Sequence, residues 1–419
     1  MSIMRETVSV GAATARELAR TGTAAKNEAL LALEALLGEH RSKLLEANEA
    51  DLEAARERDL PEAMVARLRF DEDKIESRRK ALRDIAALPD PVGQPVTSHL
   101  TPRGLDVRRI RSPLGLILMI YEARPHVTVN AGAFCLKSGN ACLLRGGSEV
   151  ARSNAVLADL WQQALDAGGL PASAVQVIQC SHEEVGEMLE MNDLITLVIP
   201  RGGKKMVRSI SRQSRIPILK HEDGICHVFV DEGCDPTTAA AIVTDSKCLM
   251  PAVCNALETL LVHRAVAETH LPVLAASLQR EGVTLRGCQH TRKVLGDIET
   301  ATDDDWDTEY LGPILAVRVV DSLDEALNHI DRHGSHHTDS IVTDSEHRAR
   351  RFTAEVDSAV TLVNASTMFD DGASLGLGAE IGISTDRLHA RGPIGLQDLT
   401  IPRYVIRGRG DTMGDWPHA

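Results

Sequence analysis

Apolar residues between positions 4 and 88 recur at spacings of three and four, as in Leu30, Leu33, Leu37 and Leu44. This period places them on one face of a helix, and the rest of the segment is rich in Ala, Glu, Arg and Lys. Pro89 and the prolines that follow it end the pattern. The first part of the chain is therefore predicted to be almost wholly helical.

After Pro113 the pattern changes to short apolar runs that alternate with helical stretches. The runs are LGLILMIY, ACLLRGG, AVQVIQ, LITLVIP, IPILK and CHVFVD. Such alternation predicts a parallel sheet with helices on both faces. A helix at 236–248 precedes a second α/β unit from about 255 to 363, with strands near 257–263, 314–320, 339–343 and 360–363. The fold class is α/β.

Composition narrows the class of protein. The chain has 419 residues and a net charge of −14, which argues against a protein that binds nucleic-acid backbone. Its eight cysteines are scattered without C-x-x-C spacing, as in a reducing compartment. The N-terminus lacks a signal-peptide core, and the longest apolar run is too short to span a bilayer. We expect a cytoplasmic protein that does not enter a membrane.

Two glycine-containing turns are candidate sites for an anion or a cofactor phosphate. LLRGGSE and IPRGGKK each follow a predicted strand and precede a predicted helix, which is where parallel sheets bind ligands. The alternative is that these glycines only form tight turns, and neither segment matches a known nucleotide fingerprint. The candidate cofactor residues here are Arg145, Gly146, Gly147, Pro200 and Gly202.

The segment HIDRHGSHH contains several histidines. His329 and His333 lie four residues apart and would share a helix face, but Gly334 interrupts the helix before a third ligand appears. We predict no metal site and a solvated helix end.

Cys254 lies in PAVCNALETLLVH, after a predicted helix and before a predicted strand. A catalytic thiol has to be partly exposed and near a group that stabilises its anion, and a loop of this kind permits both. The backbone N–H groups after it could face a developing oxyanion. The alternative is a small buried apolar residue.

Several long motifs resemble those of the gamma-glutamyl phosphate reductases, in the aldehyde dehydrogenase superfamily. They are SPLGLILMIYEARPHVTVN, LVIPRGGKK, GICHVFVD, PAVCNALETLLVH, VDSAVTLVNAST and GLGAEIGISTDRLHARGPIGL. The resemblance extends over roughly residues 10–408. It implies an aldehyde-dehydrogenase-like fold with a Rossmann-type cofactor domain (1–96 and 113–245) and an α/β catalytic domain (246–393). A hairpin at 97–112 and the chain from 394 to 419 would form an oligomerisation element, because both lie outside the two cores.

The resemblance also implies a reaction. NADPH would reduce L-glutamyl 5-phosphate to L-glutamate 5-semialdehyde in proline biosynthesis, with release of phosphate. Cys254 would attack the acyl phosphate and form a thioacyl intermediate that accepts the hydride. Two rival hypotheses remain: an acylating aldehyde dehydrogenase that uses a CoA thioester, and a catalytically silent binding protein. The expected partners are further copies of the same chain, in a homo-oligomer, and a glutamate 5-kinase that supplies the substrate.

Site residues follow from matched motifs. Glu309, before YLGPI, would hold the nicotinamide ribose, and Arg145 would lie by the adenine ribose, where a cation suits the 2′-phosphate of NADPH. Arg124 could bind a substrate carboxylate or phosphate, with an ion pair to Glu122 as the alternative. The candidate substrate-binding residues are Glu122, Arg124, His221, Asn255, Asn364 and Ser366, and loop capping is the alternative for the last two and for His221.

Three departures from the family pattern matter. Met368 stands where the family usually has the arginine of S-T-R-F, and Met250 stands where related bacterial chains often have an arginine before the proline. Part of anion recognition is therefore in question. The superfamily's hydrolytic glutamate has no counterpart, since LKHEDGICH occupies its place. A reductase should not hydrolyse its thioacyl intermediate, so this last departure fits.

Overall fold

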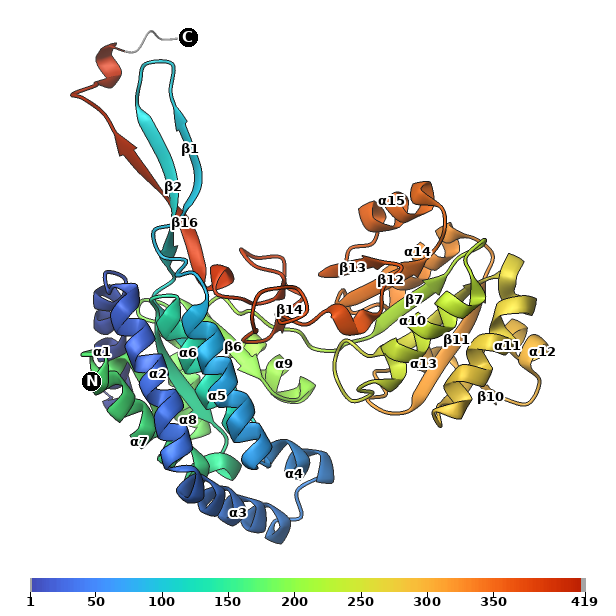
Figure 1. Cartoon of the computed structure of the whole chain (residues 1–419), viewed down its shortest axis with the longest axis horizontal. Helices are drawn as coiled ribbons and strands as arrows, with labels where there is room; N and C mark the ends of the chain where they lie inside the picture. Colours follow the sequence, from blue (N-terminus) through green and yellow to red (C-terminus); the bar gives the residue numbers. More distant parts are fainter. Residues whose placement is uncertain (1, 416–419) are drawn as a thin grey trace. The chain divides into compact units, whose positions relative to one another are not determined.

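The computed structural model describes residues 2–415 and divides into two compact units, coloured along the chain in Figure 1. The first unit contains residues 1–219, 377–382 and 394–419, and the second contains residues 220–376 and 383–393. Met1 and residues 416–419, which fall at the ends of predicted domains, lie outside the described part. No helix in the described part is long and apolar enough to cross a membrane.

The first unit begins with the predicted helical region. Leu30, Leu33 and Leu37 are completely buried, so the spacing of three and four does mark the packed face of its helix. Asp71 caps the fifth helix by accepting a hydrogen bond from Lys74 N. The helices are α1 Ile3–Leu18, α2 Thr23–Glu39, α3 Arg41–Glu57, α4 Glu62–Leu68 and α5 Glu72–Ala87.

A four-stranded parallel sheet of order β5-β4-β3-β6 forms the core of this unit. All six residues of β3 are buried, as expected for an inner strand covered on both faces. The predicted strand IPILK forms only an isolated bridge between Val198 and Ile218. The strands are β3 Leu116–Tyr121, β4 Ala141–Gly146, β5 Val175–Ile178 and β6 Leu197–Arg201; the helices are α6 Pro125–Lys137, α7 Ala151–Ala167, α8 His182–Glu190 and α9 Lys204–Gln213.

The predicted hairpin and the C-terminal strand belong to one small sheet in this unit. β1 Pro95–Leu100 and β16 Thr400–Arg407 each pair antiparallel with β2 Asp106–Pro113 between them. The two outer strands expose large apolar side chains, among them Leu100 (70%), Tyr404 (63%) and Ile406 (59%). The structure thus pairs two segments that are distant in the sequence, and the role of the sheet in oligomerisation stays a prediction.

The second unit is built on a seven-stranded parallel sheet of order β10-β9-β11-β8-β7-β12-β13. All seven residues of β8, near the middle of the sheet, are buried. The four strands predicted in this region are present, and the sequence patterns did not reveal β9 and β10. The strands are β7 Cys226–Val230, β8 Leu257–His263, β9 Thr284–Gly287, β10 Glu299–Thr300, β11 Ile314–Val320, β12 Thr338–Val342 and β13 Val360–Val363.

The remaining described elements are helices, 3₁₀ turns and one two-residue strand pair. The helices are α10 Pro236–Cys248, α11 Arg264–Arg280, α12 Gln289–Leu295, α13 Asp303–Trp306, α14 Leu323–His333 and α15 Glu346–Glu355. The 3₁₀ turns are η1 Ser148–Val150, η2 Ala172–Ala174, η3 Thr367–Phe369, η4 Gln397–Leu399 and η5 Met413–Asp415, and β14 Ile383–Ser384 pairs with β15 Gly392–Pro393.

The unit boundary differs from the one expected at residues 245 and 246. β7 was expected in the cofactor domain, but it hydrogen-bonds to β8 and β12 and so belongs to the second sheet. The second unit therefore begins at Lys220. The apolar run CHVFVD predicts a buried strand correctly, but a run of this kind carries no information about which of two parallel sheets it joins.

The predicted solvated helix end at His329 is wrong. The side chain lies in α14 with 4% exposure, and its ring centroid is 5.5 Å from Trp306 and 5.4 Å from His227. Burial, with smaller contributions from His227 and Arg318, lowers the pKa of His329 to about 2. Neither ring nitrogen has a hydrogen-bond partner among the described residues.

Candidate active site

Cys254 lies in the turn between α10 and β8, as expected, and is half-buried. Its carbonyl oxygen accepts a hydrogen bond from the Cys226 thiol at 3.3 Å. The segment before β7 crosses close by, since a Cβ at Gly224 would lie 1.9 Å from the same oxygen. Only glycine permits this approach, and the contact fixes the backbone that carries the thiol.

Glu309 is held near this backbone, because Gly224 N donates a hydrogen bond to Glu309 Oε1 at 2.9 Å. Leu311, two residues further on, has a positive φ of 52° and donates its N–H to Glu258 at 3.1 Å. Glu258 pairs at 2.6 Å with Lys247, and both side chains are completely buried. A buried ion pair thus supports the loop that presents Glu309.

Burial disfavours the charge on both members of that pair. It raises the pKa of Glu258 to about 7 and lowers the pKa of Lys247, although each partner opposes the shift in the other. The short contact and the N–H of Leu311 favour the ionised carboxylate. The ion pair therefore holds the loop that presents Glu309, although desolvation of the two charges is unfavourable. Removing one partner would leave the other charge buried and uncompensated.

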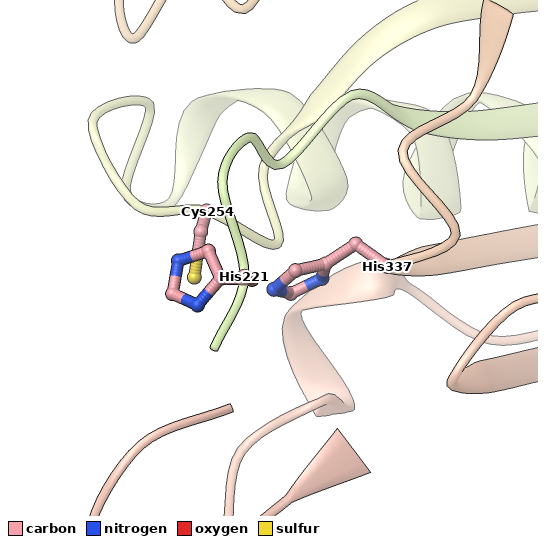
Figure 2. A group of neighbouring side chains, drawn as sticks. All are labelled: His221, Cys254 and His337. Carbon is pink, nitrogen blue, oxygen red and sulfur yellow. The ribbon is translucent and has the colours of Figure 1, made fainter. Parts of the chain in front are cut away.

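Two histidines lie beside the thiol (Figure 2). One ligand atom each from His221, Cys254 and His337 falls within 4.8 Å of the other two. The His221 and His337 rings meet edge to face with centroids 5.3 Å apart. Burial, and then the neighbouring His221, lowers the pKa of His337 to about 3, so this ring is neutral at physiological pH.

The strand order explains why these three residues meet. His221 precedes β7, Cys254 precedes β8 and His337 immediately precedes β12, and these are neighbouring parallel strands. Their amino ends therefore share one edge of the sheet. His337 was missed from the sequence as a site residue; its position just before the predicted strand near 339–343 was a usable signal, but only once the strand order was known.

The first unit contains a separate cavity of about 420 Å³ at the carboxyl ends of β3 and β4. Glu122 and Arg145 contribute polar groups, and Lys205 adds a second cation from α9. The other lining residues come from β3, α8 and α9, and they are Ile120, His182, Val185, Leu189, Met206, Ser209, Ile210 and Gln213. The cavity combines an apolar body with two cations, which suits an aromatic ligand that carries phosphate.

Arg145 and the glycines shape this cavity. Arg145 Nη2 donates to Cys180 O at 3.1 Å, and its buried Nε has no hydrogen-bond partner among the described residues. A Cβ at Gly202 would lie 2.4 Å from Glu122 Oε2, and one at Gly146 would lie 2.3 Å from Asn154 Nδ2. The glycines therefore allow close packing around the cavity, and Arg145 retains hydrogen-bonding capacity there.

Comparison with known proteins identifies the family. The family model described as "Aldehyde dehydrogenase family" matches residues 4–285. The chain belongs to the aldehyde dehydrogenase family.

Solved structures narrow the likeness within this family. Gamma-glutamyl phosphate reductase from Thermotoga maritima is 40% identical, with a TM-score of 0.95 over 98% of this chain and 100% of that chain. The Saccharomyces cerevisiae gamma-glutamyl phosphate reductase is 29% identical, with a TM-score of 0.57 over 99% and 100%. An acetylating aldehyde dehydrogenase from Geobacillus thermoglucosidasius, 17% identical with a TM-score of 0.69 over 98% and 97%, shares the fold. The resemblance drawn from the sequence motifs and the α/β fold class are confirmed.

Three expected substrate residues of this aldehyde dehydrogenase use their side chains for local structure. Asn364 has a φ of 53° and exchanges two hydrogen bonds with the backbone of Thr343. Ser366 accepts from Met368 N and caps η3. Asn255 Nδ2 donates to the carbonyls of Thr367 and Asp370. The hydrogen bonds of Asn364 and Ser366 agree with the alternative of loop capping. Asn255 links the turn that contains Cys254 to η3.

The residues of YEARP take different positions. Glu122 was expected beside the substrate, but its carboxylate accepts from Gly203 N at 2.7 Å and lines the cavity that contains Arg145. Arg124 immediately precedes α6 and donates to Arg201 O at 3.0 Å.

The other expected cofactor residues near the cavity have backbone roles. Pro200 is buried within β6, and Gly147 N donates to Tyr121 O at 2.9 Å. A Cβ at Gly147 would come within 2.2 Å of the Glu149 carboxylate, so the turn after β4 also depends on glycine.

The two methionines at positions where the resemblance leads us to expect arginine differ in environment. Met368 lies in η3 with 8% exposure, whereas Met250 has 52% exposure in the segment before Cys254. A buried arginine would need partners that an apolar side chain does not, so the surroundings of Met368 suit methionine.

Proposed function

We propose that this protein reduces L-glutamyl 5-phosphate to L-glutamate 5-semialdehyde with release of phosphate, as an oxidoreductase of proline biosynthesis. The observation that carries the proposal is the 40% identity to the Thermotoga maritima gamma-glutamyl phosphate reductase along 98% of the chain. The position of Cys254 on a half-buried turn anchored by Gly224 supports the same reaction.

NADPH is the proposed reductant. In the cavity of the first unit, the apolar side chains from α8 and α9 suit an adenine ring, and the buried Nε of Arg145 is an unused donor for phosphate oxygens. Lys205 adds positive charge there. We assign Glu122 to this cavity rather than to the substrate. In the second unit, Glu309 is the candidate for the nicotinamide ribose hydroxyls.

His221 is the proposed proton acceptor for the Cys254 thiol. Its Nδ1 lies 3.1 Å from the carbonyl oxygen of Ile383, and a carbonyl can only accept. Nδ1 therefore carries the proton, and Nε2 of the neutral ring carries a lone pair that can take the thiol proton. The resulting thiolate attacks the acyl carbon, and a backbone N–H of the turn would stabilise the oxyanion.

Collapse of the oxyanion breaks the bond to phosphate and leaves a thioester on Cys254. The cofactor, when bound, supplies a hydride to the thioester carbon. The C–S bond then breaks, the aldehyde leaves, and the imidazolium of His221 returns its proton to the thiolate. The hydrolytic glutamate of the superfamily is replaced here by LKHEDGICH, in which Glu222 pairs with Lys220 at 3.2 Å.

The deciding assay runs the reaction in reverse. NADPH formation is followed from glutamate semialdehyde, NADP and phosphate, with CoA replacing phosphate in a parallel reaction. Phosphate-dependent activity is expected. Activity with CoA alone would instead identify the acylating dehydrogenase, and the absence of both would favour a binding protein.

Cys254→Ala tests the nucleophile in the same assay. Loss of the attacking thiol should reduce kcat by at least about 10³-fold, because no other group can form the thioester. Cys288→Ala is the matched control, a partly exposed thiol of the same unit, and should leave kcat unchanged. Turnover by Cys254→Ala at the rate of the unmodified protein would rule out the thioacyl route.

The expected partners and location remain part of this proposal. All eight cysteines are free, which agrees with a reducing cytoplasm. A glutamate 5-kinase would supply the acyl phosphate. The exposed apolar side chains of β1 and β16 are a candidate self-association surface, so Tyr404→Arg should lower the mass measured by light scattering if the protein is a homo-oligomer.

A further inference from the structure

The cluster of His221, Cys254 and His337 has the composition of a metal centre. No metal site was predicted from the sequence, and its patterns did not group these three residues. One ligand atom from each lies within 4.8 Å of the other two. Around tetrahedral zinc, thiolate and imidazole donors lie about 3.5 Å from one another. Coordination would therefore require side-chain rotations that bring these three atoms closer together.

Both imidazoles are in the tautomer that a metal requires. Nδ1 of His221 donates to the Ile383 carbonyl, which leaves the lone pair on Nε2. Nδ1 of His337 lies 2.7 Å from Thr338 Oγ1, whose own proton goes to Asp370 Oδ2. Thr338 can therefore only accept from His337, and the lone pair of His337 is also on Nε2.

His337 supplies the observation that points to a ligand. Its ring is completely buried, and Nε2 has no hydrogen-bond partner among the described residues. An unpartnered buried lone pair is unfavourable, and a bound cation would satisfy it. Figure 2 shows the His337 ring directed toward His221 and the Cys254 side chain.

The groups behind the ring match those of metal-binding histidines. A ligating histidine usually donates its second nitrogen to a carboxylate, a backbone carbonyl or water, which fixes the ring and strengthens the ligand. Asp370 Oδ2 lies 3.5 Å from His337 Nδ1 in addition to the Thr338 contact. The Ile383 carbonyl has the same role for His221.

We propose that His221 Nε2, Cys254 Sγ and His337 Nε2 bind a thiophilic divalent cation, Zn²⁺ above all, and that this cation reversibly blocks the Cys254 nucleophile. Binding forms a metal–sulfur bond and releases the thiol proton to solvent, with no change in oxidation state. Three protein ligands leave the fourth tetrahedral position to water. One thiolate and two imidazoles favour Zn²⁺ or Co²⁺ over Mg²⁺ and Ca²⁺, which prefer oxygen.

Cobalt titration tests the site directly, without substrate or NADPH. The full chain, stripped with a chelator and kept reduced, is titrated with Co²⁺ while its absorption is recorded. One equivalent should produce tetrahedral d–d bands and a thiolate charge-transfer band, and Zn²⁺ should displace both. A titration without a thiolate band would overturn the proposal.

Ligand variants locate the site. Cys254→Ser should abolish the charge-transfer band, and His221→Gln and His337→Gln should each weaken Co²⁺ binding by at least about tenfold. Because His337 is buried, its variant is accepted only with a native circular dichroism spectrum, and half-buried His221 gives an independent test. The matched controls, Cys288→Ser and exposed His347→Gln, should bind as the unmodified protein does.

Cys226 is the main alternative to Cys254 as the thiolate ligand. Its Sγ lies 3.8 Å from His337 Nδ1, but complete burial raises the pKa of its thiol well above the ordinary value. A band that survives Cys254→Ser and disappears in Cys226→Ser would move the thiolate ligand and overturn the proposal. The metal titration and the reverse assay can fail separately, because the first measures binding to the protein alone.

Discussion

The two candidate sites lie at opposite ends of their sheets. In the first unit, the cavity with Arg145 is at the carboxyl ends of β3 and β4, beside the amino end of α9. In the second unit, His221, Cys254 and His337 precede β7, β8 and β12 and so lie at the amino ends of these strands. Carboxyl ends of parallel strands meet helix N-termini, which favour anions. The amino ends of parallel strands do not meet helix N-termini, so a site there depends on side chains for its reactive and binding groups.

The difference extends to how the residues are held. The cations that line the cavity of the first unit lie at a partly open surface, where water solvates part of their charge. The second unit holds its candidate residues through completely buried polar groups, such as Lys247 with Glu258. We expect substitutions in the second unit to affect folding as well as activity, and those in the cavity to affect mainly binding.

Lys247→Ala should have the largest effect on stability. It leaves the Glu258 carboxylate buried without its cation and should lower the free energy of unfolding by about 3–5 kcal/mol. Glu309 is presented by the loop that Glu258 holds through Leu311 N, so KM for the nicotinamide cofactor should rise too. Urea denaturation and steady-state kinetics measure the two effects.

The double variant Lys247→Met with Glu258→Leu is the matched control for this pair. It removes both charges and keeps apolar volume, so it should be much closer to the unmodified protein than Lys247→Ala is. If the single and double variants were equally unstable, the loss would come from packing and not from an unpaired charge.

Arg145→Met is expected to have the next largest effect, confined to binding. A charge-assisted hydrogen bond to the 2′-phosphate contributes about 1.5–3 kcal/mol, so KM for NADPH should rise about 10- to 150-fold while KM for NADH stays nearly constant. Exposed Lys80→Met in the same unit is the control for lost surface charge. Equal increases for both cofactors would remove Arg145 from 2′-phosphate recognition.

The sequence predicted most elements of both units because their apolar runs are clean, as in β3 and β8, where every residue is buried. It placed Cys254 correctly on a turn. It could not assign β7 to a sheet, because hydrogen-bonding partners are not encoded in the apolar pattern of one strand. His337 was overlooked for the same reason, since its place beside Cys254 depends on the order β8-β7-β12.

Glu122 shows a second limit of sequence reasoning. Motif position predicts a place for Glu122 near the substrate, but it does not give the direction of the side chain. That direction depends on Gly203, from whose N–H the carboxylate accepts, and on Gly202, where a Cβ would collide with it. Asn364 is similar, because its positive φ turns its amide toward the backbone of Thr343. A motif locates a residue along the chain, and only the backbone decides what its side chain contacts.

The smallest predicted effect concerns acid stability in the second unit. His329 has a folded-state pKa of about 2, lowered by burial and then by its neighbour His227. A depressed folded-state pKa contributes stability that is present above the unfolded-state value of about 6.5 and is lost as pH falls below it. Between pH 7.5 and 5.5 the free energy of unfolding should fall by about 1 kcal/mol through this residue, and His329→Phe should remove that part of the slope.

Exposed His347→Gln, from α15 of the same unit, should leave the slope unchanged. Urea denaturation across this range measures both, and an unaltered slope in His329→Phe would mean that other buried groups, and not this imidazole, set the acid sensitivity of the unit.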